Sequence, residues 1–205
     1  MKITYFPLPG RAMVMRACLK MAGIEFVDEI VTFDQFKEMK GEAGFSDQLP
    51  LGSMPVLTLD DGTIVVQSMA INRYIGKLTK MYPEDAKEQL FVDEILDSVA
   101  DLMTSAPQHS DPDTKKKLRE EFGVGKMKIF FNFFAKKLEA KGPYFGGENM
   151  TIADLAFYAA VKGVRDGSFD YIAVDYDAAW PSIVAFMNTV EANPSFAAVS
   201  PWAAK

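Results

Sequence analysis

The chain has 205 residues, of which 49% are hydrophobic and 24% are charged, a composition typical of one globular domain or two small ones. Its formal net charge of -6 makes it a poor general partner for nucleic acid, which requires clustered Lys and Arg. No run of 18 or more apolar residues is present that would span a membrane, and the N-terminus lacks the pattern of a signal peptide. We therefore expect a cytoplasmic protein with neither nucleic-acid nor membrane partners.

The chain has one cysteine, Cys18, and one histidine, His109. A single thiol forms no internal disulfide, which fits a reducing compartment. Cys18 lies in the helical pattern MRACLKMAG, and we interpret it as a small buried hydrophobe. One Cys and one His offer neither a metal cluster nor a catalytic triad, so no metal is expected. The chemistry must come from other groups or from a bound cofactor.

The first third alternates between strand and helix patterns. In chain order these are a strand at 3–8, a helix at 11–23, a strand at 24–31 and a short helix at 33–40. Pro9 and Gly10 mark the first boundary, and Gly23 marks the end of the first helix. A strand, a helix and a second strand in this order predict a parallel pair with a crossover helix.

A β-hairpin follows the loop GEAGFSDQLPLGS. Its strands are predicted at 56–59 and 63–66, because Asp61-Gly62 between them is a strong hairpin turn signal. Ser68 is placed to cap the next helix, predicted at 69–79. Residues 1–78 are therefore predicted to form a small α/β domain with the order βαβαββα.

The rest of the chain is predicted to form an all-helical domain, residues 84–205. Helices are expected at 86–105, at 114–140 with FFNFF at its centre, at 182–192 and after Pro194. Gly123 and Gly125 are points where the long helix can bend, and FFNFF is interpreted as core. Thr151 and Asp154 form a capping-box pattern before another apolar run, with Asp in place of the usual Glu.

Four segments together resemble the cytosolic glutathione S-transferases: TYFPLPGRA, the loop ending in MPVL, the hairpin followed by VVQSMAINRYI, and GENMTIADL. The resemblance covers essentially the whole chain and is greatest to the sigma class, which includes glutathione-dependent prostaglandin D synthases and squid lens crystallins. It implies a thioredoxin-like N-terminal domain, a helical C-terminal domain, glutathione as co-substrate and a homodimer. Detoxification is the role that it suggests.

The resemblance gives the phenol of Tyr5 a catalytic role, stabilising the thiolate of glutathione. A free thiol of this type has a pKa near 8.5, and lowering it by about two units requires roughly 2.7 kcal/mol of preference for the charged form. One hydrogen bond to a charged group contributes about 1.5 to 3 kcal/mol. A single phenol O–H therefore supplies most of the effect. The alternative is that Tyr5 is an ordinary aromatic residue on a strand.

The resemblance also implies which residues hold glutathione. Met54, before a cis-proline, would pair its backbone with the cysteinyl part, and Asp101 would reach the ligand of the partner subunit. Phe36 and Ser53 depart from the family pattern, since relatives carry Trp and often Lys or Gln there. The full predicted set is Arg11, Phe36, Lys40, Ser53, Met54, Pro55, Gln67, Ser68 and, from the partner subunit, Asp101.

An apolar second substrate is expected to bind between the domains. The candidate residues of this electrophile pocket are Phe6, Leu8, Met103, Ser105, Ala106 and His109. The stretch MTSAPQHS lacks the tryptophan that prostaglandin D synthases carry near this position, which favours a general electrophile pocket over that isomerase. Leu51 stands where some classes insert an aromatic key into their dimer partner.

Three functional hypotheses follow from the resemblance. The first is an enzyme that conjugates glutathione to small apolar electrophiles, or a related peroxidase or isomerase of lipid substrates that uses the same thiolate. The second is a crystallin-like or ligand-binding relative without turnover. The third is a scaffold module, such as the transferase-like domain of translation factors. The short stretch PQHSDPDTKKK shows no crystallin-type insertion, and the enzyme is favoured.

Overall fold

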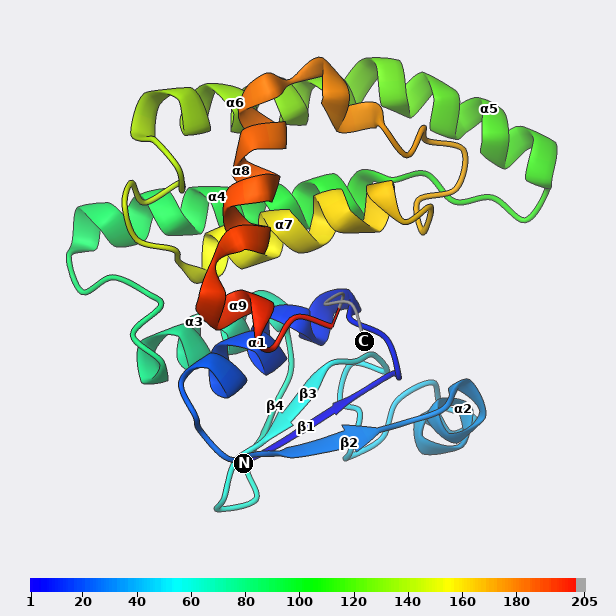
Figure 1. Cartoon of the computed structure of the whole chain (residues 1–205). Coiled ribbons are helices and arrows are strands. Elements are labelled where there is room, and N and C mark those ends of the chain that lie inside the picture. Colours follow the sequence, from blue (N-terminus) through cyan, green and yellow to red (C-terminus); the bar gives the residue numbers. More distant parts are fainter. Residues whose placement is uncertain (202–205) are drawn as a thin grey trace. The chain divides into compact units, whose positions relative to one another are not determined.

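A four-stranded mixed sheet organises the first of two structural units in the computed structural model (Figure 1). The structure describes residues 1–201, so 202–205, the end of the predicted helical domain, lie outside the described residues. Of the described residues, the first unit comprises Met1–Met81 together with 198–201, and the second comprises Tyr82–Ala197.

The sheet has the strand order β2-β1-β3-β4. Its strands are β1 (Lys2–Tyr5), β2 (Val27–Ile30), β3 (Val56–Thr58) and β4 (Ile64–Val65). The predicted parallel pair is confirmed, since β1 and β2 run parallel, while β1 with β3 and β3 with β4 are antiparallel. Strands β1 and β2 are shorter than the strands predicted at 3–8 and 24–31. Along β1, Ile3 and Tyr5 face one side of the sheet and Lys2 and Thr4 the other, because side chains alternate along a strand.

The helical segments of the first unit are η1 (Gly10–Ala12), α1 (Met13–Met21), α2 (Phe33–Lys40) and α3 (Ser68–Leu78). Helices α1 and α3 pack together, and α1 contributes most of its residues to the core, including Cys18, as predicted. Of the eight described residues of α2, none is buried. This helix is instead fixed at its start by a capping box, in which Thr32 and Gln35 exchange side-chain-to-backbone hydrogen bonds.

The second unit is helical. Its elements are α4 (Ala86–Ser105), α5 (Pro112–Phe122), η2 (Gly123–Met127), α6 (Lys128–Lys141), α7 (Ile152–Arg165), η3 (Tyr176–Ala179), α8 (Pro181–Ala192) and α9 (Pro194–Ala197). Helix α4 packs against α7, and α6 against α8. The predicted core role of FFNFF is confirmed for Phe131 and Phe134, which are buried among other aromatic rings.

The long helix predicted at 114–140, with Gly123 and Gly125 as points where it can bend, corresponds to α5 and α6 joined by a π-helical turn, η2, that begins at Gly123. The phenol of Tyr176 donates a hydrogen bond to the carbonyl of Gly123 at this turn, and burial raises the pKa of Tyr176 to about 12. A side chain at Gly123 would meet Ile172 at 3.1 Å. The interruption therefore lies where the 166–175 segment packs closely against the helix.

The predicted capping box at the start of α7 is confirmed. The Asp154 carboxylate is fully buried and accepts hydrogen bonds from the backbone N–H of Thr151 at 2.7 Å and of Phe145 at 2.8 Å. It also accepts the hydroxyl of Thr151 at 2.9 Å. Burial raises the pKa of Asp154 to about 6, against these stabilising hydrogen bonds. One side chain thus ties the preceding loop to the helix N-terminus.

Candidate active site

Tyr5 stands at the end of β1, where the chain leaves the sheet for η1. Its ring is buried, with 7% of the residue exposed, and its Oη accepts the backbone N–H of Arg11 at 3.1 Å. Because that hydrogen bond uses a lone pair of the phenol oxygen, the O–H hydrogen is left to donate to a ligand. The N-terminal end of a helix also favours negative charge nearby. This arrangement suits a group that must stabilise an anion.

Gly10 permits the close approach of Tyr5 to this helix end. Its φ is +40°, and an added Cβ would lie 2.5 Å from Tyr5 Oη and 2.7 Å from Leu8 Cδ1. Any side chain here would displace the phenol. The sequence marked Gly10 only as a turn residue, so its role against Tyr5 is visible only in the structure.

Arg16, on α1, holds the segment between Tyr5 and η1. Its guanidinium donates to the carbonyl of Leu8 at 2.8 Å, and its Cζ lies 5.7 Å from the centre of the Tyr5 ring. An ion pair with Asp28 at 2.9 Å fixes the guanidinium itself. Arg16 was not predicted as a site residue, because nothing in its local sequence pattern separates it from a surface arginine on a helix.

An aromatic cluster continues from Tyr5 toward α2. The Phe6 ring lies 5.4 Å from that of Tyr5 and 5.3 Å from that of Phe36, both edge to face. The Lys40 ammonium lies 5.7 Å from the centre of the Phe36 ring. The structure therefore joins predicted residues of the electrophile pocket and of the glutathione site in one continuous set of contacts. Phe33, which was not predicted as a site residue, belongs to the same aromatic cluster through its contact with Phe6.

The Met54–Pro55 peptide bond is cis, as the resemblance implies. Both residues are buried and lead directly into β3, whereas Ser53 is exposed. Gly52 lies against the carbonyl of Gly44 and the Lys40 side chain so closely that an added Cβ would collide with both. The loop before the cis-proline is thus packed against the end of α2.

Gln67 and Ser68 stand at the N-terminus of α3. The expectation that Ser68 caps this helix is wrong, because Ser68 is its first residue and Gln67 occupies the capping position without a side-chain capping bond. Gln67 has φ 77°, a left-handed conformation unfavourable for a residue other than glycine. Such strain in a non-glycine residue is a recognised mark of functional sites. The N-terminus of α3, which has no side-chain cap, offers backbone N–H groups of the kind that suit a carboxylate.

Arg11 and Leu8 are exposed on the first unit, beside the buried Tyr5. The remaining predicted residues belong to the second unit, at or just beyond the end of α4. Asp101 and Met103 are exposed on that helix, and Ser105 donates its hydroxyl to the carbonyl of Asp101. His109 follows in an exposed loop, where its Nδ1 accepts the backbone N–H of Asp111 at 3.0 Å. This hydrogen bond gives His109 a local structural role.

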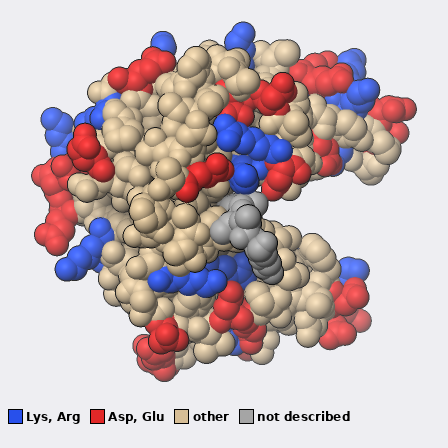
Figure 2. Space-filling model, viewed as in Figure 1, with Lys and Arg blue, Asp and Glu red and all other residues tan. Residues whose placement is uncertain are grey.

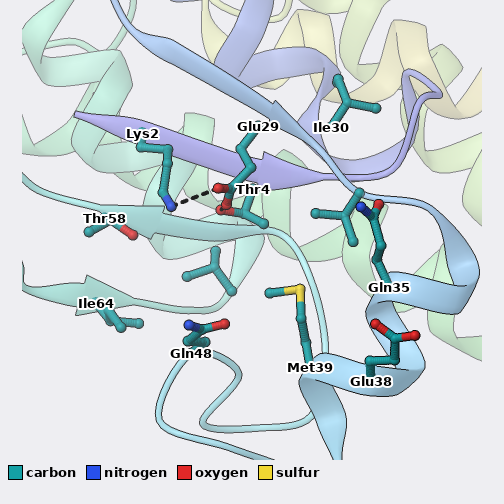
Figure 3. A pocket seen from close by; sticks show the side chains of 12 residues that line it. Lys2, Thr4, Glu29, Ile30, Gln35, Glu38, Met39, Gln48, Thr58 and Ile64 are labelled. Atoms are coloured by element: carbon teal, nitrogen blue, oxygen red, sulfur yellow. Dashed lines mark hydrogen bonds and ion pairs between the residues drawn. The ribbon is translucent and has the colours of Figure 1, made fainter.

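A cavity of about 480 Å³ lies on the sheet face that carries Lys2 and Thr4 (Figure 3). Its floor holds a hydrogen-bonded trio, in which Glu29 accepts the Lys2 ammonium at 2.9 Å and the Thr4 hydroxyl at 2.6 Å. These bonds, led by that from Thr4, lower the pKa of Glu29. None of the predicted site residues lines this cavity, which is therefore separate from the Tyr5 site.

Among the described residues, no three His, Cys, Asp or Glu side chains cluster so as to hold a metal ion. None of the helices within residues 1–201 is both long and apolar enough to cross a membrane. On the face drawn in Figure 2, basic and acidic side chains are interspersed.

Comparison with known proteins gives the family of this fold and site. The family model described as "Glutathione S-transferase, N-terminal domain" matches residues 1–77, and the one described as "Glutathione S-transferase, C-terminal domain" matches 96–199. The chain belongs to the glutathione S-transferase family. Its thioredoxin-like first unit and helical second unit are the two parts of that fold.

Several relatives of this transferase chain are similar over three quarters or more of its length. Hematopoietic prostaglandin D synthase of Gallus gallus is 30% identical over 202 residues, covering 96% of this chain and 93% of the relative. Glutathione S-transferase 3 of Caenorhabditis elegans is 30% identical over 162 residues, covering 75% of each. The solved structure of prostaglandin synthase D of Nilaparvata lugens is 26% identical, with a TM-score of 0.82 and coverage of 96% and 94%.

Proposed function

We propose that this protein is a glutathione transferase in which Tyr5 stabilises the thiolate of glutathione for attack on small apolar electrophiles. The observation that carries the proposal is the phenol Oη at the start of η1, oriented by the N–H of Arg11 at 3.1 Å. An ordinary phenol is neutral at pH 7 and donates its O–H. The helix end and the donated proton both favour negative charge at the same point.

The residues around Tyr5 would position the rest of the tripeptide. Met54, which precedes the cis-proline, would pair its backbone with the cysteinyl backbone as an added strand does. The strained Gln67 and the free N-terminus of α3 suit the γ-glutamyl carboxylate. Lys40, held over Phe36, suits the glycyl carboxylate at the other end. Arg11 and Ser53 are exposed beside these groups and complete the proposed set.

The proposed reaction needs no group beyond the two substrates. The thiol proton leaves to solvent, and the sulfur forms a bond to the electrophilic carbon. In a substitution, the bond to the leaving group breaks and its electron pair departs with that group. In an addition to a conjugated carbonyl, the resulting carbanion takes a proton from water. The protein contributes thiolate stabilisation and orientation, which is the form of catalysis that a positioned donor provides.

The proposal extends to the assembly and to the class. We place the protein in the sigma class on the strength of TYFPLPGRA and VVQSMAINRYI, as a cytoplasmic homodimer in detoxification. Leu51 is 58% exposed and suits a contact with the partner, and Asp101 would reach the partner's glutathione. Phe6, Leu8, Met103, Ser105, Ala106 and His109 remain the proposed electrophile pocket. The similarity to prostaglandin synthases keeps lipid isomerase or peroxidase activity as the alternative.

A panel of electrophiles tests the proposal. Initial rates of glutathione conjugation should exceed the uncatalysed rates for aryl halides or conjugated carbonyls, and Tyr5→Phe should lower them by about 10- to 100-fold, as expected from losing a hydrogen bond to a charged group. Conjugation no faster than in buffer would overturn the proposal. Rates on a lipid endoperoxide that exceed all conjugation rates would favour the isomerase instead.

A further inference from the structure

Phe33 presents a large aromatic surface to solvent. It is the first residue of α2 and is 60% exposed, although the ring is supported from behind. The capping box of Thr32 and Gln35 fixes the backbone at this point. The exposed ring is therefore carried by an ordered helix start and not by a loop tip.

The support behind Phe33 is a stack of rings that leads to the proposed catalytic phenol. The rings of Phe33 and Phe6 are stacked, with centroids 4.5 Å apart and an angle of 27° between planes. Phe36 holds Phe6 from the side at 5.3 Å, edge to face at 72°. Phe6 in turn meets the Tyr5 ring at 5.4 Å. The free face of Phe33 thus lies two ring contacts away from Tyr5, within the same structural unit.

A stacked pair with one open face is suited to a third flat ring. Aromatic rings prefer offset-stacked arrangements at such distances, and an electron-poor ring is attracted to the negative face of phenylalanine. We propose that Phe33, backed by Phe6, is a specificity-determining residue that favours flat, electron-poor aromatic electrophiles over aliphatic ones. This inference rests on the proposed transferase function and names its preferred substrate class.

The test compares two electrophiles across a matched set of variants. The aryl halide 1-chloro-2,4-dinitrobenzene offers a flat ring, and trans-2-nonenal offers an aliphatic acceptor. Phe33→Ala removes the ring, whereas Phe33→Tyr keeps it. Phe45→Ala is the control, because Phe45 is exposed to nearly the same extent, 59%, and lies in the same unit.

For Phe33→Ala we expect kcat/KM with the aryl halide to fall by about three- to ten-fold, mainly through KM, as for loss of one stacking contact. In the same variant, kcat/KM with nonenal should change by less than about two-fold. Neither Phe33→Tyr nor Phe45→Ala should change the ratio of kcat/KM with the aryl halide to kcat/KM with nonenal. An equal loss on both electrophiles, or no loss on either, would overturn the proposed specificity.

Binding separates this inference from the proposed function. Calorimetry measures the affinity of each variant for S-(2,4-dinitrophenyl)glutathione and for S-hexylglutathione, which requires no turnover. A selective three- to ten-fold loss for the dinitrophenyl ligand in Phe33→Ala would support the aromatic contact even if the wild type proved inactive as a transferase. Equal affinities of Phe33→Ala and wild type for that ligand would refute it, whatever the enzyme's activity.

Discussion

Substituting Gly10 with alanine tests whether the position of the Tyr5 phenol matters for the proposed chemistry. The added Cβ would lie 2.5 Å from Tyr5 Oη and 2.7 Å from Leu8 Cδ1. Ordinary contacts lie near 3.5 Å, so the phenol must move by about 1 Å. That movement breaks the 3.1 Å hydrogen bond from Arg11 and removes the O–H from its place beside the thiolate.

The magnitude follows from the hydrogen bond that is lost. A hydrogen bond to a charged group contributes about 1.5 to 3 kcal/mol, which corresponds to roughly 10- to 100-fold in kcat/KM. The positive φ of +40° also costs stability, by about 1 kcal/mol for a residue with a side chain. We therefore expect Gly10→Ala to lower activity sharply and stability modestly, and to raise the pKa of the bound glutathione thiol.

Gly23→Ala is the matched control. Gly23 also has a positive φ, +65°, but an added Cβ there meets nothing within 4 Å. Gly23→Ala should lower the stability about as much as Gly10→Ala does, but it should leave kcat/KM and the pKa of the bound glutathione thiol unchanged. The assay is steady-state conjugation together with thermal unfolding of both variants. Equal activity of Gly10→Ala and Gly23→Ala would refute the argument that Gly10 positions the phenol.

Three further predictions concern buried groups. Asp154→Ala would leave the buried N–H groups of Phe145 and Thr151 without their acceptor, so the free energy of unfolding measured in urea should fall by about 2 to 5 kcal/mol; a loss below about 1 kcal/mol would contradict this. Because burial raises the pKa of Asp154 from 3.8 to about 6, the part of the stability that comes from this shift is full below pH 3.8 and is lost as the pH rises through 6. A carboxyl ¹³C titration of Asp154 without a transition between pH 5 and 7 would disprove the shift. Burial raises the pKa of Cys18 to about 12, so a disulfide reagent at pH 8 should modify the thiol only after denaturation, and modification of the native protein would argue against that burial.

Local chemistry accounts for the elements that the sequence predicted well. The hairpin follows from Asp61-Gly62, where Gly62 has φ 86°. The bounds of α2 and α4 match the prediction because Thr32 and Asp85 cap their first turns. The start of α7 follows from the box of Thr151 with Asp154 in the same way. Each of these signals depends only on residues that lie close together in the sequence.

Contacts between distant residues account for what the sequence did not predict. The glycines marked the place where the long helix can bend, but the hydrogen bond from Tyr176 to Gly123, more than fifty residues away, had no signal in the sequence. The start of α3 depends on Gln67 adopting a positive φ, which its residue type disfavours. Arg16 and Phe33 enter the site through contacts with Leu8 and Phe6 that no local pattern signals. Tyr5 itself was predicted because its chain context resembles a known family, whereas its bond to Arg11 required the structure.

The proposed role of Tyr5 is tested most directly by the pKa of glutathione bound to the protein. The ultraviolet absorbance of the thiolate is followed against pH for wild type and Tyr5→Phe, each saturated with glutathione. We expect a bound thiol pKa about two units below the free value near 8.5 in wild type, and a value close to the free one in Tyr5→Phe. A bound thiol that titrates near 8.5 in both proteins would contradict the account and leave a glutathione-binding relative without an activating phenol.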